Sequence, residues 1–311
     1  MDSEVACLSG GYHMMRKWMA GTQQAGPGRS DLIERIALIV FYAFTAMSVL
    51  GYAVFGLHPE LLAQTPSAIK VYSVAFTFFP RAHVLLGFAT LALVLFRRTG
   101  VRWLPAFAAC YLLSLGSELA GTTVGLPFGP YHYTAGLGTK WFGHVPVLIP
   151  LSWFFMALPS YLLARAALAR EARGLRAGRV ITIAVGSLVL LAWDLALDPA
   201  MSWITKYWVW GQEGPYYGMP LLNLFGWYAT GIALMIALAL LGADRWGDAL
   251  PVRWMLWYYG ANLLLPLGMI AAAGLWWAVL FSIAAVGASL WLPRLYAPRP
   301  RRQAAPLQEA S

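Results

Sequence analysis

Long apolar segments are the feature that most limits how this chain can fold. Residues 221–242, for example, read LLNLFGWYATGIALMIALALLG and contain no charged side chain. A helix of about 20 apolar residues spans the hydrocarbon core of a bilayer. Such segments recur, and we place them at residues 33–56, 75–96, 103–121, 146–168, 180–199, 221–242, 254–272 and 275–292.

Two of these segments are less regular than the others. Pro80, Arg81 and His83 interrupt the second one, and only a tight turn near Ala273 and Gly274 separates the last two. Seven spans are therefore the alternative to eight. We predict an all-α fold, a polytopic transmembrane helix bundle with seven or eight spans.

Charged residues separate the apolar segments and predict the orientation of the bundle. The chain is 60% hydrophobic and only 11% charged, whereas a soluble domain carries about 25% charged residues. Its net charge of +9 comes from basic residues between apolar segments, which indicates membrane topology and no nucleic-acid partner. With both termini in the cytoplasm, 18 of the 22 basic residues lie on the cytoplasmic side, leaving Lys70, Arg81, Lys140 and Lys206 outside. We expect a multi-pass protein of the cytoplasmic (inner) membrane.

The pattern also predicts the organisation of the chain. Residues 1–31 contain no apolar core of signal-peptide length and are predicted to form a flexible cytoplasmic head. Residues 32–293 are predicted to form a single integral membrane domain, and the Pro- and Arg-rich residues 294–311 a disordered cytoplasmic tail. The two cysteines, Cys7 and Cys110, indicate neither a disulfide framework nor a metal site.

The two longest connections between spans, about 122–145 and 200–220, both fall on the predicted outer face. They are rich in Gly, Pro and aromatic residues. Each single Tyr or Trp there is explained well by an interfacial belt. The high density of aromatic residues, together with the polar residues beside them, indicates that both connections form folded structures at or within the membrane.

A short internal echo links these connections. GPYHY is followed by PVLIPLSW, which ends at Trp153, and GPYYG is followed by PLLNLFGW, which ends at Trp227. The Pro and Trp positions of the two copies share one offset, and acidic residues precede each copy. The echo is compatible with a parallel repeat of two helix pairs and a site between them, or with chance.

Three acidic side chains in predicted spans are the candidates for chemistry: Glu118, Asp194 and Asp198. An ionisable group within a span costs about 2.5–3.5 kcal/mol on insertion scales, so it usually faces protein or a wet cavity. Asp194 and Asp198 share one helix face, and two carboxylates so close in a low dielectric do not both ionise easily. The alternative is that each Asp caps a helix end or pairs with Lys140 or Lys206.

Missing motifs exclude several classes of protein. The five histidines form no H-x-x-H or H-x-x-x-H pair, which excludes a membrane di-iron desaturase or hydroxylase. No Gly-rich dinucleotide loop and no G-x-S-x-G motif is present. For His132, a structural or interfacial role fits the sequence as well as a catalytic role does. Asn223 is expected to hydrogen-bond across helices.

Acid catalysis on an apolar substrate, with neither cofactor nor metal, agrees with this residue set. A protonated Asp among aromatic rings is suited to protonating a carbon–carbon double bond, because the resulting carbocation can lie over aromatic faces at about 2 kcal/mol per desolvated contact. A second carboxylate can then deprotonate the attacking water.

The segments SELAGTTVGLPFGPYHYTAGLGTKWFGHVPVLIPLSWFFMALPSYLLA, AWDLALDPAMSW and GPYYGMPLLNLFGWYATG resemble the CruF-type carotenoid hydratases over about residues 114–231. The resemblance implies addition of water across the terminal C1=C2 double bond of an acyclic carotenoid end, giving a tertiary alcohol. It implies a carotenoid substrate in the bilayer, and we expect other enzymes of carotenoid synthesis as partners.

Roles for individual residues are inferences from this sequence. We expect Asp194 or Asp198 to donate the proton and Glu118 to be its partner or the base for water. The predicted substrate-binding residues are Trp193, Tyr131, His132, Tyr133, Trp203, Tyr216, Tyr217 and Asn223.

Two other classes of function compete with this interpretation. The D-x-x-x-D spacing is similar to that of membrane prenyltransferases of the UbiA superfamily, where aspartates hold Mg²⁺ against a diphosphate. However, this chain has no second Asp-rich motif, and its pair is predicted at the outer end. A non-enzymatic carotenoid or lipid carrier, or a transporter with acidic proton relays, is the other alternative.

Overall fold

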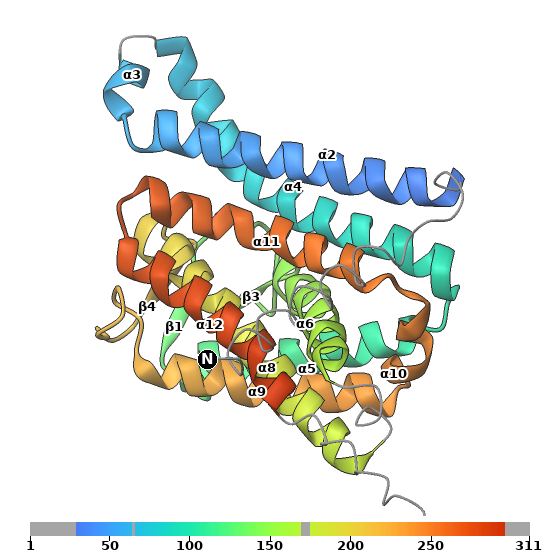
Figure 1. The fold of residues 1–311 in the computed structure, drawn as a ribbon. Coiled ribbons are helices and arrows are strands. Elements are labelled where there is room, and N and C mark those ends of the chain that lie inside the picture. The colour runs from blue at the N-terminus through green and yellow to red at the C-terminus, as the bar shows by residue number, and fades with distance from the viewer. Residues whose placement is uncertain (1–28, 64–65, 169–174, 296–311) are drawn as a thin grey trace, which may run out of the picture. The chain divides into compact units, whose positions relative to one another are not determined.

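A computed structural model describes residues 29–63, 66–168 and 175–295 of the chain (Figure 1). Seven helices within these residues are long and apolar enough to cross a membrane. They are α2 (Arg29–Gly51, extended by the π-helical turn η1, Tyr52–Gly56), α4 (Pro66–Thr99), α5 (Leu104–Val124), α6 (Leu148–Ala167), α8 (Arg176–Asp198, extended by the π-helical turn η2, Pro199–Ile204), α9 (Leu221–Leu240) and α11 (Val252–Ala272). The helix α12 (Trp276–Leu295) adds a shorter apolar segment, Trp276–Trp291. The predicted all-α transmembrane bundle of seven or eight spans is confirmed.

The chain divides into two compact units, Met1–Ala37 and Leu38–Ser311. Of the first unit, only the beginning of α2 is described. The predicted head (residues 1–31) and tail (294–311) lie almost wholly outside the described residues. The predicted limits of the membrane domain, and the side of the membrane that each end faces, stay predictions.

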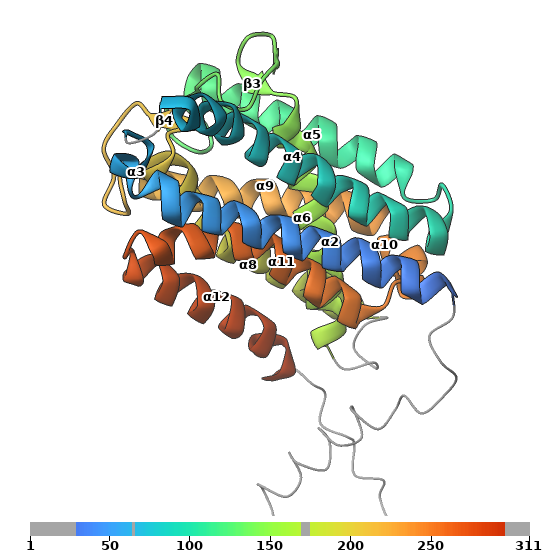
Figure 2. The same cartoon turned by 90° about the horizontal axis from the view of Figure 1, so that it is seen from above.

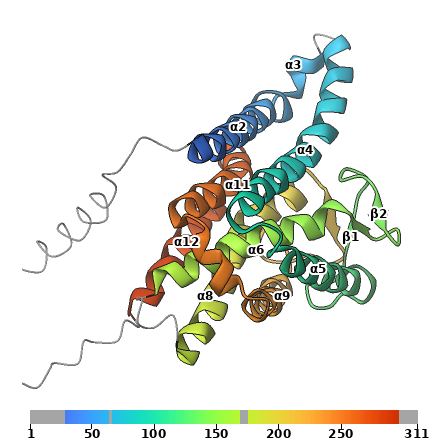
Figure 3. The same cartoon turned by 90° about the vertical axis from the view of Figure 1, so that its right-hand side faces the viewer.

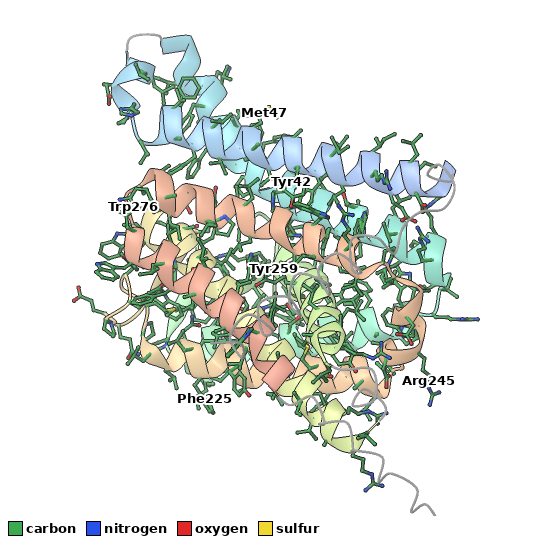
Figure 4. All side chains as sticks on the ribbon, viewed as in Figure 1. Tyr42, Met47, Phe225, Arg245, Tyr259 and Trp276 are labelled. Atoms are coloured by element: carbon green, nitrogen blue, oxygen red, sulfur yellow. The ribbon has the colours of Figure 1, made fainter. Side chains whose placement is uncertain are left out.

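The second unit has two different ends. At one end, which we call the strand end, α5, α8 and α11 finish and α6, α9 and α12 begin, and the short strands described below lie there (Figure 1). The opposite end carries α10 (Ala243–Trp246) and the 3-10 turn η3 (Gly247–Ala249). Trp276 and Arg245 mark these two ends (Figure 4). Ion pairs Arg165–Asp248 and Arg179–Asp244 tie α6 and α8 to the α10 region.

Helix α6 forms the centre of the bundle. It contacts α4, α5, α8, α9, α11 and α12, and Figure 3 shows these helices around it. Helix α12 packs along α8 and α11 at one side of the bundle (Figure 2). A Cβ at Gly231 of α9 would lie 3.2 Å from Cβ of Ser187 on α8. Small residues at this crossing therefore let the two backbones approach closely, as is common between membrane helices.

Pro80 does not break the second span. Helix α4 runs without interruption from Pro66 to Thr99, which is longer at both ends than the predicted segment 75–96. Proline has no N–H, so the carbonyl of Phe76, four residues earlier, loses its helical partner. The hydroxyl of Tyr207 donates to that carbonyl at 2.8 Å instead. The helix persists because a side chain from the strand end replaces the missing donor.

The same replacement occurs at two other prolines. The Tyr216 hydroxyl donates at 2.7 Å to the carbonyl of Leu195, four residues before Pro199. The Trp193 indole donates at 3.3 Å to the carbonyl of Asn262, four residues before Pro266. Aromatic side chains therefore complete the hydrogen bonding of helix backbones around one region of the bundle.

Candidate active site

The two long connections at the strand end meet in a short antiparallel ribbon. Strand β1 (Tyr131–Tyr133) pairs with β4 (Trp208–Trp210), so that Tyr131 lies opposite Trp210 and Tyr133 opposite Trp208. A second small hairpin joins β2 (Lys140–Trp141) to β3 (Val145–Pro146) within the first connection. Because side chains alternate along a strand, both tyrosines and both tryptophans share one face of the ribbon.

Glu118 of α5 is bound by this face. Its side chain is buried, and its Oε2 accepts hydrogen bonds from the hydroxyls of Tyr131 and Tyr133, the latter at 2.8 Å. The Trp153 indole of α6 donates to Oε1 at 2.8 Å. Three donors from two elements therefore fix the position of this carboxyl group without any cation.

The tyrosines remain neutral donors. Burial raises the pKa of Tyr131 and Tyr133 well above the usual value for a phenol, and the nearby Glu118 carboxyl raises the pKa of both further. Each hydroxyl therefore keeps its proton at physiological pH and can donate it in a hydrogen bond to the carboxyl group.

Asp198, the last residue of α8, is held by the other strand of the ribbon. It is only 1% exposed. The Trp208 indole donates to Oδ1 at 2.7 Å, while Trp210 and Ser202 donate to Oδ2 at 3.3 and 3.4 Å. Oδ1 is therefore held tightly and Oδ2 more loosely.

Asp194 lies one helical turn before Asp198 and is fully buried. Asn223 of α9 donates to its Oδ2 at 3.0 Å, and its Oδ1 has no hydrogen-bond partner among the described residues. This carboxyl group therefore has the fewest donors of the three. Asn223 bonds across helices, as predicted from its place in a span.

Neither lysine considered in the alternative interpretation pairs with the aspartates. The Lys140 ammonium donates to the carbonyl of Tyr133 at 2.5 Å. Lys206 lies over the Trp203 ring, 5.2 Å from its centroid. Within the described residues, Asp194 and Asp198 form no salt bridge, so their burial is balanced by neutral donors alone.

Glu118 and Asp198 face a common cavity of about 90 Å³, which we call the acid cavity. Its wall includes five indole rings, those of Trp153, Trp193, Trp208, Trp210 and Trp227. Trp153 and Trp227, the residues that end the two copies of the sequence echo, stack with centroids 4.0 Å apart. The cavity is therefore small, aromatic and acidic.

A larger apolar chamber of about 490 Å³ adjoins the acid cavity. The two share Pro80, Met201 and Leu265 in their walls. None of the described residues around the chamber is charged, and six aromatic side chains line it: Tyr52, Phe55, Tyr72, Phe76, Phe79 and Tyr207.

The chamber reaches the outer apolar surface of the bundle. Met47 and Val71 belong to its wall and are also 52% and 70% exposed. Figure 4 shows Met47 on α2 at the outside of the molecule. The chamber therefore lies between this outer apolar surface and the acid cavity, with which it shares part of its wall.

The structure brings together part of the residue set predicted from the sequence. Glu118, Asp198, Tyr131, Tyr133, Trp193 and Asn223 line the acid cavity. Asp194 lies behind this wall, in contact with Asn223.

Four predicted substrate-binding residues do not line the acid cavity. His132 points away from the ribbon face and is exposed, and Trp203 is half exposed. The Tyr217 ring contacts the rings of Trp203 and Tyr216. The hydroxyl of Tyr216 donates to the backbone carbonyl of Leu195 in α8.

Other residues of the site were not singled out by the sequence. Trp208 and Trp210 alternate in YWVWG, a signal for two side chains on one strand face. Trp153 belongs to the echo, but nothing local connects it to Glu118. His83 and Asn262 also line the acid cavity. In the sequence, Asn262 is distinguished only as a polar residue within an apolar span.

Carboxyl groups that face an aromatic, largely apolar cavity can exchange protons with an apolar molecule. Positive charge that develops on such a molecule is stabilised by ring faces and by a nearby carboxylate. The geometry thus suits acid–base chemistry on a hydrocarbon.

Comparison with known proteins places this chain in a family. A family model described as "Carotenoid biosynthesis protein" matches residues 79–288, a range that contains every carboxyl and indole group of the acid cavity. The chain belongs to this family of carotenoid biosynthesis proteins. The match extends well beyond residues 114–231, whose motifs resemble those of the CruF-type carotenoid hydratases.

A named relative agrees with this assignment. The chain is 32% identical over 276 residues to the bisanhydrobacterioruberin hydratase of Haloarcula japonica, an alignment that covers 81% of this chain and 87% of the relative. No solved structure matches the chain. The predicted resemblance to the CruF-type carotenoid hydratases is confirmed.

Proposed function

We propose that this protein adds water across the terminal C1=C2 double bond of an acyclic carotenoid end and produces a tertiary alcohol. The hydratase name of the Haloarcula relative supports hydration as the reaction class. The observation that carries the proposal is the arrangement of Asp198 and Glu118 on one aromatic cavity that adjoins an apolar chamber.

Asp198 is the proposed proton donor. It lines the acid cavity, and its Oδ2 has only two long hydrogen bonds, so this oxygen is free to carry the transferable proton. The proton adds to the CH carbon of the double bond, because this leaves a tertiary cation on the neighbouring carbon. Asp194, one turn away, is the proposed proton-sharing partner rather than the donor, since it lies behind the cavity wall.

Glu118 and the indole rings then stabilise the cation. Each cation–π contact contributes about 2 kcal/mol when it is desolvated. The three donors on Glu118 hold its carboxylate in place, so that it acts as a fixed negative charge at the cavity wall. Attack of water on the cation gives the alcohol, and the net reaction consumes neither a redox cofactor nor a metal.

The apolar chamber is the proposed seat of the polyene chain behind the reacting end. Its volume lies within the usual range of about 300–1,000 Å³ for ligand pockets, whereas the acid cavity is far smaller. The substrate therefore enters from the bilayer, with its terminal group passing Pro80, Met201 and Leu265 toward the carboxyl groups. We propose the cytoplasmic membrane as the site of this reaction, close to other enzymes of carotenoid synthesis.

Expression in a lycopene-producing host tests this function. Chromatography and mass spectrometry of the pigment should reveal the gain of one water for each reacted end, and an Asp198→Asn/Glu118→Gln double variant should leave the pigment unchanged. Unchanged pigment with the wild-type protein would contradict the proposal. A product that forms only with Mg²⁺ and a prenyl diphosphate would identify a prenyltransferase, and binding of carotenoid without turnover would identify a carrier.

A further inference from the structure

Two buried polar atoms in the acid cavity have no hydrogen-bond partner among the described residues. They are Nε2 of His83 on α4 and Oδ1 of Asn262 on α11. Their side chains are 5% and 1% exposed, and both line the same cavity as Asp198 and Glu118. The carboxyl groups come from α5 and α8, so this polar pair belongs to a different part of the wall.

The two residues belong to one packed cluster. His83 and Gly87 lie one turn apart on α4, and a Cβ at Gly87 would be 3.4 Å from Oδ1 of Asn262. The Phe41 ring contacts both sites, with its centroid 4.9 Å from that of His83 and its Cζ 3.2 Å from the Gly87 Cβ position. His83 and Asn262 therefore lie near each other across the α4–α11 contact.

The orientation of Asn262 is fixed by its own hydrogen bonds. Its side-chain Nδ2 donates to the carbonyl of Tyr258 at 2.9 Å, and its backbone carbonyl accepts from Trp193. Its Oδ1 is consequently the atom left to accept a hydrogen bond from the cavity. Nε2 of His83 is similarly available, as an acceptor when the ring proton is on Nδ1.

Leaving such atoms unpaired is unfavourable. Each buried, unsatisfied polar group costs about 1–3 kcal/mol. A buried water usually satisfies such groups when it has two to four polar partners and about 30 Å³ of space. The acid cavity has a volume of about 90 Å³, and both His83 and Asn262 line it.

We propose that His83 and Asn262 bind the water molecule that attacks the carbocation, and that Nε2 of His83 accepts its proton. This water site rests on the proposed hydration. Asn262 Oδ1 accepts one O–H of the water and His83 Nε2 the other, so that an oxygen lone pair points into the cavity. This lone pair forms the C–O bond while the O–H bond to His83 breaks. The proton held on His83 then returns to Asp198, which restores the acid.

This assignment changes the role expected for Glu118. Both oxygens of Glu118 already accept hydrogen bonds, Oε2 from two tyrosine hydroxyls and Oε1 from the Trp153 indole, whereas His83 Nε2 has no competing partner in the described residues. Glu118 is therefore the counter-charge of the cation, and His83 is the base for water. Separating the acid from the water site also keeps the nucleophile away from the proton that must first reach carbon.

Deuterium partitioning in D₂O tests the water site. In the wild-type protein, the cation formed by deuteron transfer is trapped by water. In His83→Phe and Asn262→Leu, protonation of the alkene continues, but the cation returns to alkene more often. We expect alcohol formation to fall by at least about 100-fold for His83→Phe, the lower range for loss of a general base. The ratio of deuterium-labelled recovered alkene to alcohol should rise in both variants.

Two further variants make the result decisive. His83→Gln keeps a polar side chain but cannot take up the proton, so it should retain part of the water binding and lose most of the turnover. Thr99→Val removes a buried hydroxyl from the same helix, which donates to the Leu95 carbonyl, and should keep the wild-type ratio. Monodisperse elution in detergent checks folding, and the Gln variant replaces the Phe variant if the latter aggregates.

Each outcome has a defined meaning. A raised ratio of labelled alkene to alcohol supports the water site. A wild-type ratio, whether total turnover is normal or reduced, overturns it, because a merely structural role lowers labelling and hydration together. Absence of alcohol from the wild-type protein would instead contradict the proposed hydration itself.

Discussion

Tyr133 and Trp208 lie directly opposite each other in the β1–β4 ribbon, and each donates a hydrogen bond to a different buried carboxyl group. Tyr133 donates to Glu118 of α5 at 2.8 Å, and Trp208 donates to Asp198 of α8 at 2.7 Å. Pairing of the two connections is therefore what brings the donors of both acids to one cavity. The ribbon both covers the site and holds its two carboxyl groups in position.

Removing the proposed acid should abolish hydration without unfolding the protein. Asp198→Asn keeps the shape of the side chain but has no transferable proton, so we expect turnover to fall by at least about 100-fold. Pigment analysis in a carotenoid-producing host measures this directly. Asp248→Asn is the matched control, because this carboxylate is exposed at the opposite end of the bundle and pairs with Arg165. Normal alcohol production by Asp198→Asn would refute its role as the donor.

The two tryptophans on Asp198 should differ in importance. Among the described residues, Trp208 alone donates to Oδ1, whereas Trp210 shares Oδ2 with Ser202 at longer distances. Trp208→Phe should therefore reduce stability by about 0.5–1.5 kcal/mol, the usual net contribution of a hydrogen bond between neutral groups, because Asp198 is proposed to hold its proton. Trp210→Phe should cost less. Thermal unfolding of both variants in the same detergent compares them, and the reverse order would argue against the distances found here.

Tyr207 and Pro80 should be energetically coupled. Tyr207→Phe leaves the Phe76 carbonyl without a donor, at a cost of about 1–3 kcal/mol. Pro80→Ala restores a backbone N–H for that carbonyl, so the same Tyr207→Phe change should cost less in the Pro80→Ala background. A double-mutant cycle of unfolding free energies measures this coupling. Additive effects would show that the hydroxyl does not replace the helical donor.

Filling the apolar chamber should impair the use of long substrates. Ala75 lines the chamber, and Ala75→Phe places a ring in the proposed path of the polyene. We expect a KM at least about tenfold higher, equivalent to about 1.4 kcal/mol of lost binding. Val74→Phe is the control, because Val74 is the adjacent residue of α4 and points outward, 62% exposed. An equal effect of both variants would place the polyene elsewhere.

The sequence was sufficient for the membrane architecture and for the acids. Apolar segments of fixed length predict spans whatever packs around them, and Glu118 and Asp198 attract attention because ionisable groups are costly in a span. Both signals are local. The sequence suggested an irregular span around Pro80, whereas α4 continues through it. This continuity involves Tyr207, which is 131 positions from Phe76 in the sequence, so no local pattern could predict it.

The remainder of the site depends on contacts that local patterns do not encode. Trp203 and Tyr216 stand in the same aromatic-rich connection as Trp208 and Trp210, yet only the latter two face Asp198. Trp208 and Trp210 lie on one face of β4, which turns inward when β4 pairs with β1, whereas Trp203 lies in the turn η2 and Tyr216 lies outside both strands. His83 was visible in the sequence as an interruption of a span, but its position beside Asn262 comes from helix packing.

Isotope labelling of the product tests the central claim most directly. Purified protein is incubated anaerobically with an acyclic carotenoid in deuterated, heavy-oxygen water. We predict one carbon-bound deuterium beside the new tertiary alcohol and one solvent oxygen in each hydroxyl group, with neither label acquired in the Asp198→Asn variant. An alcohol without carbon-bound deuterium, or one whose oxygen does not come from water, would contradict protonation of the double bond by the buried carboxyl group.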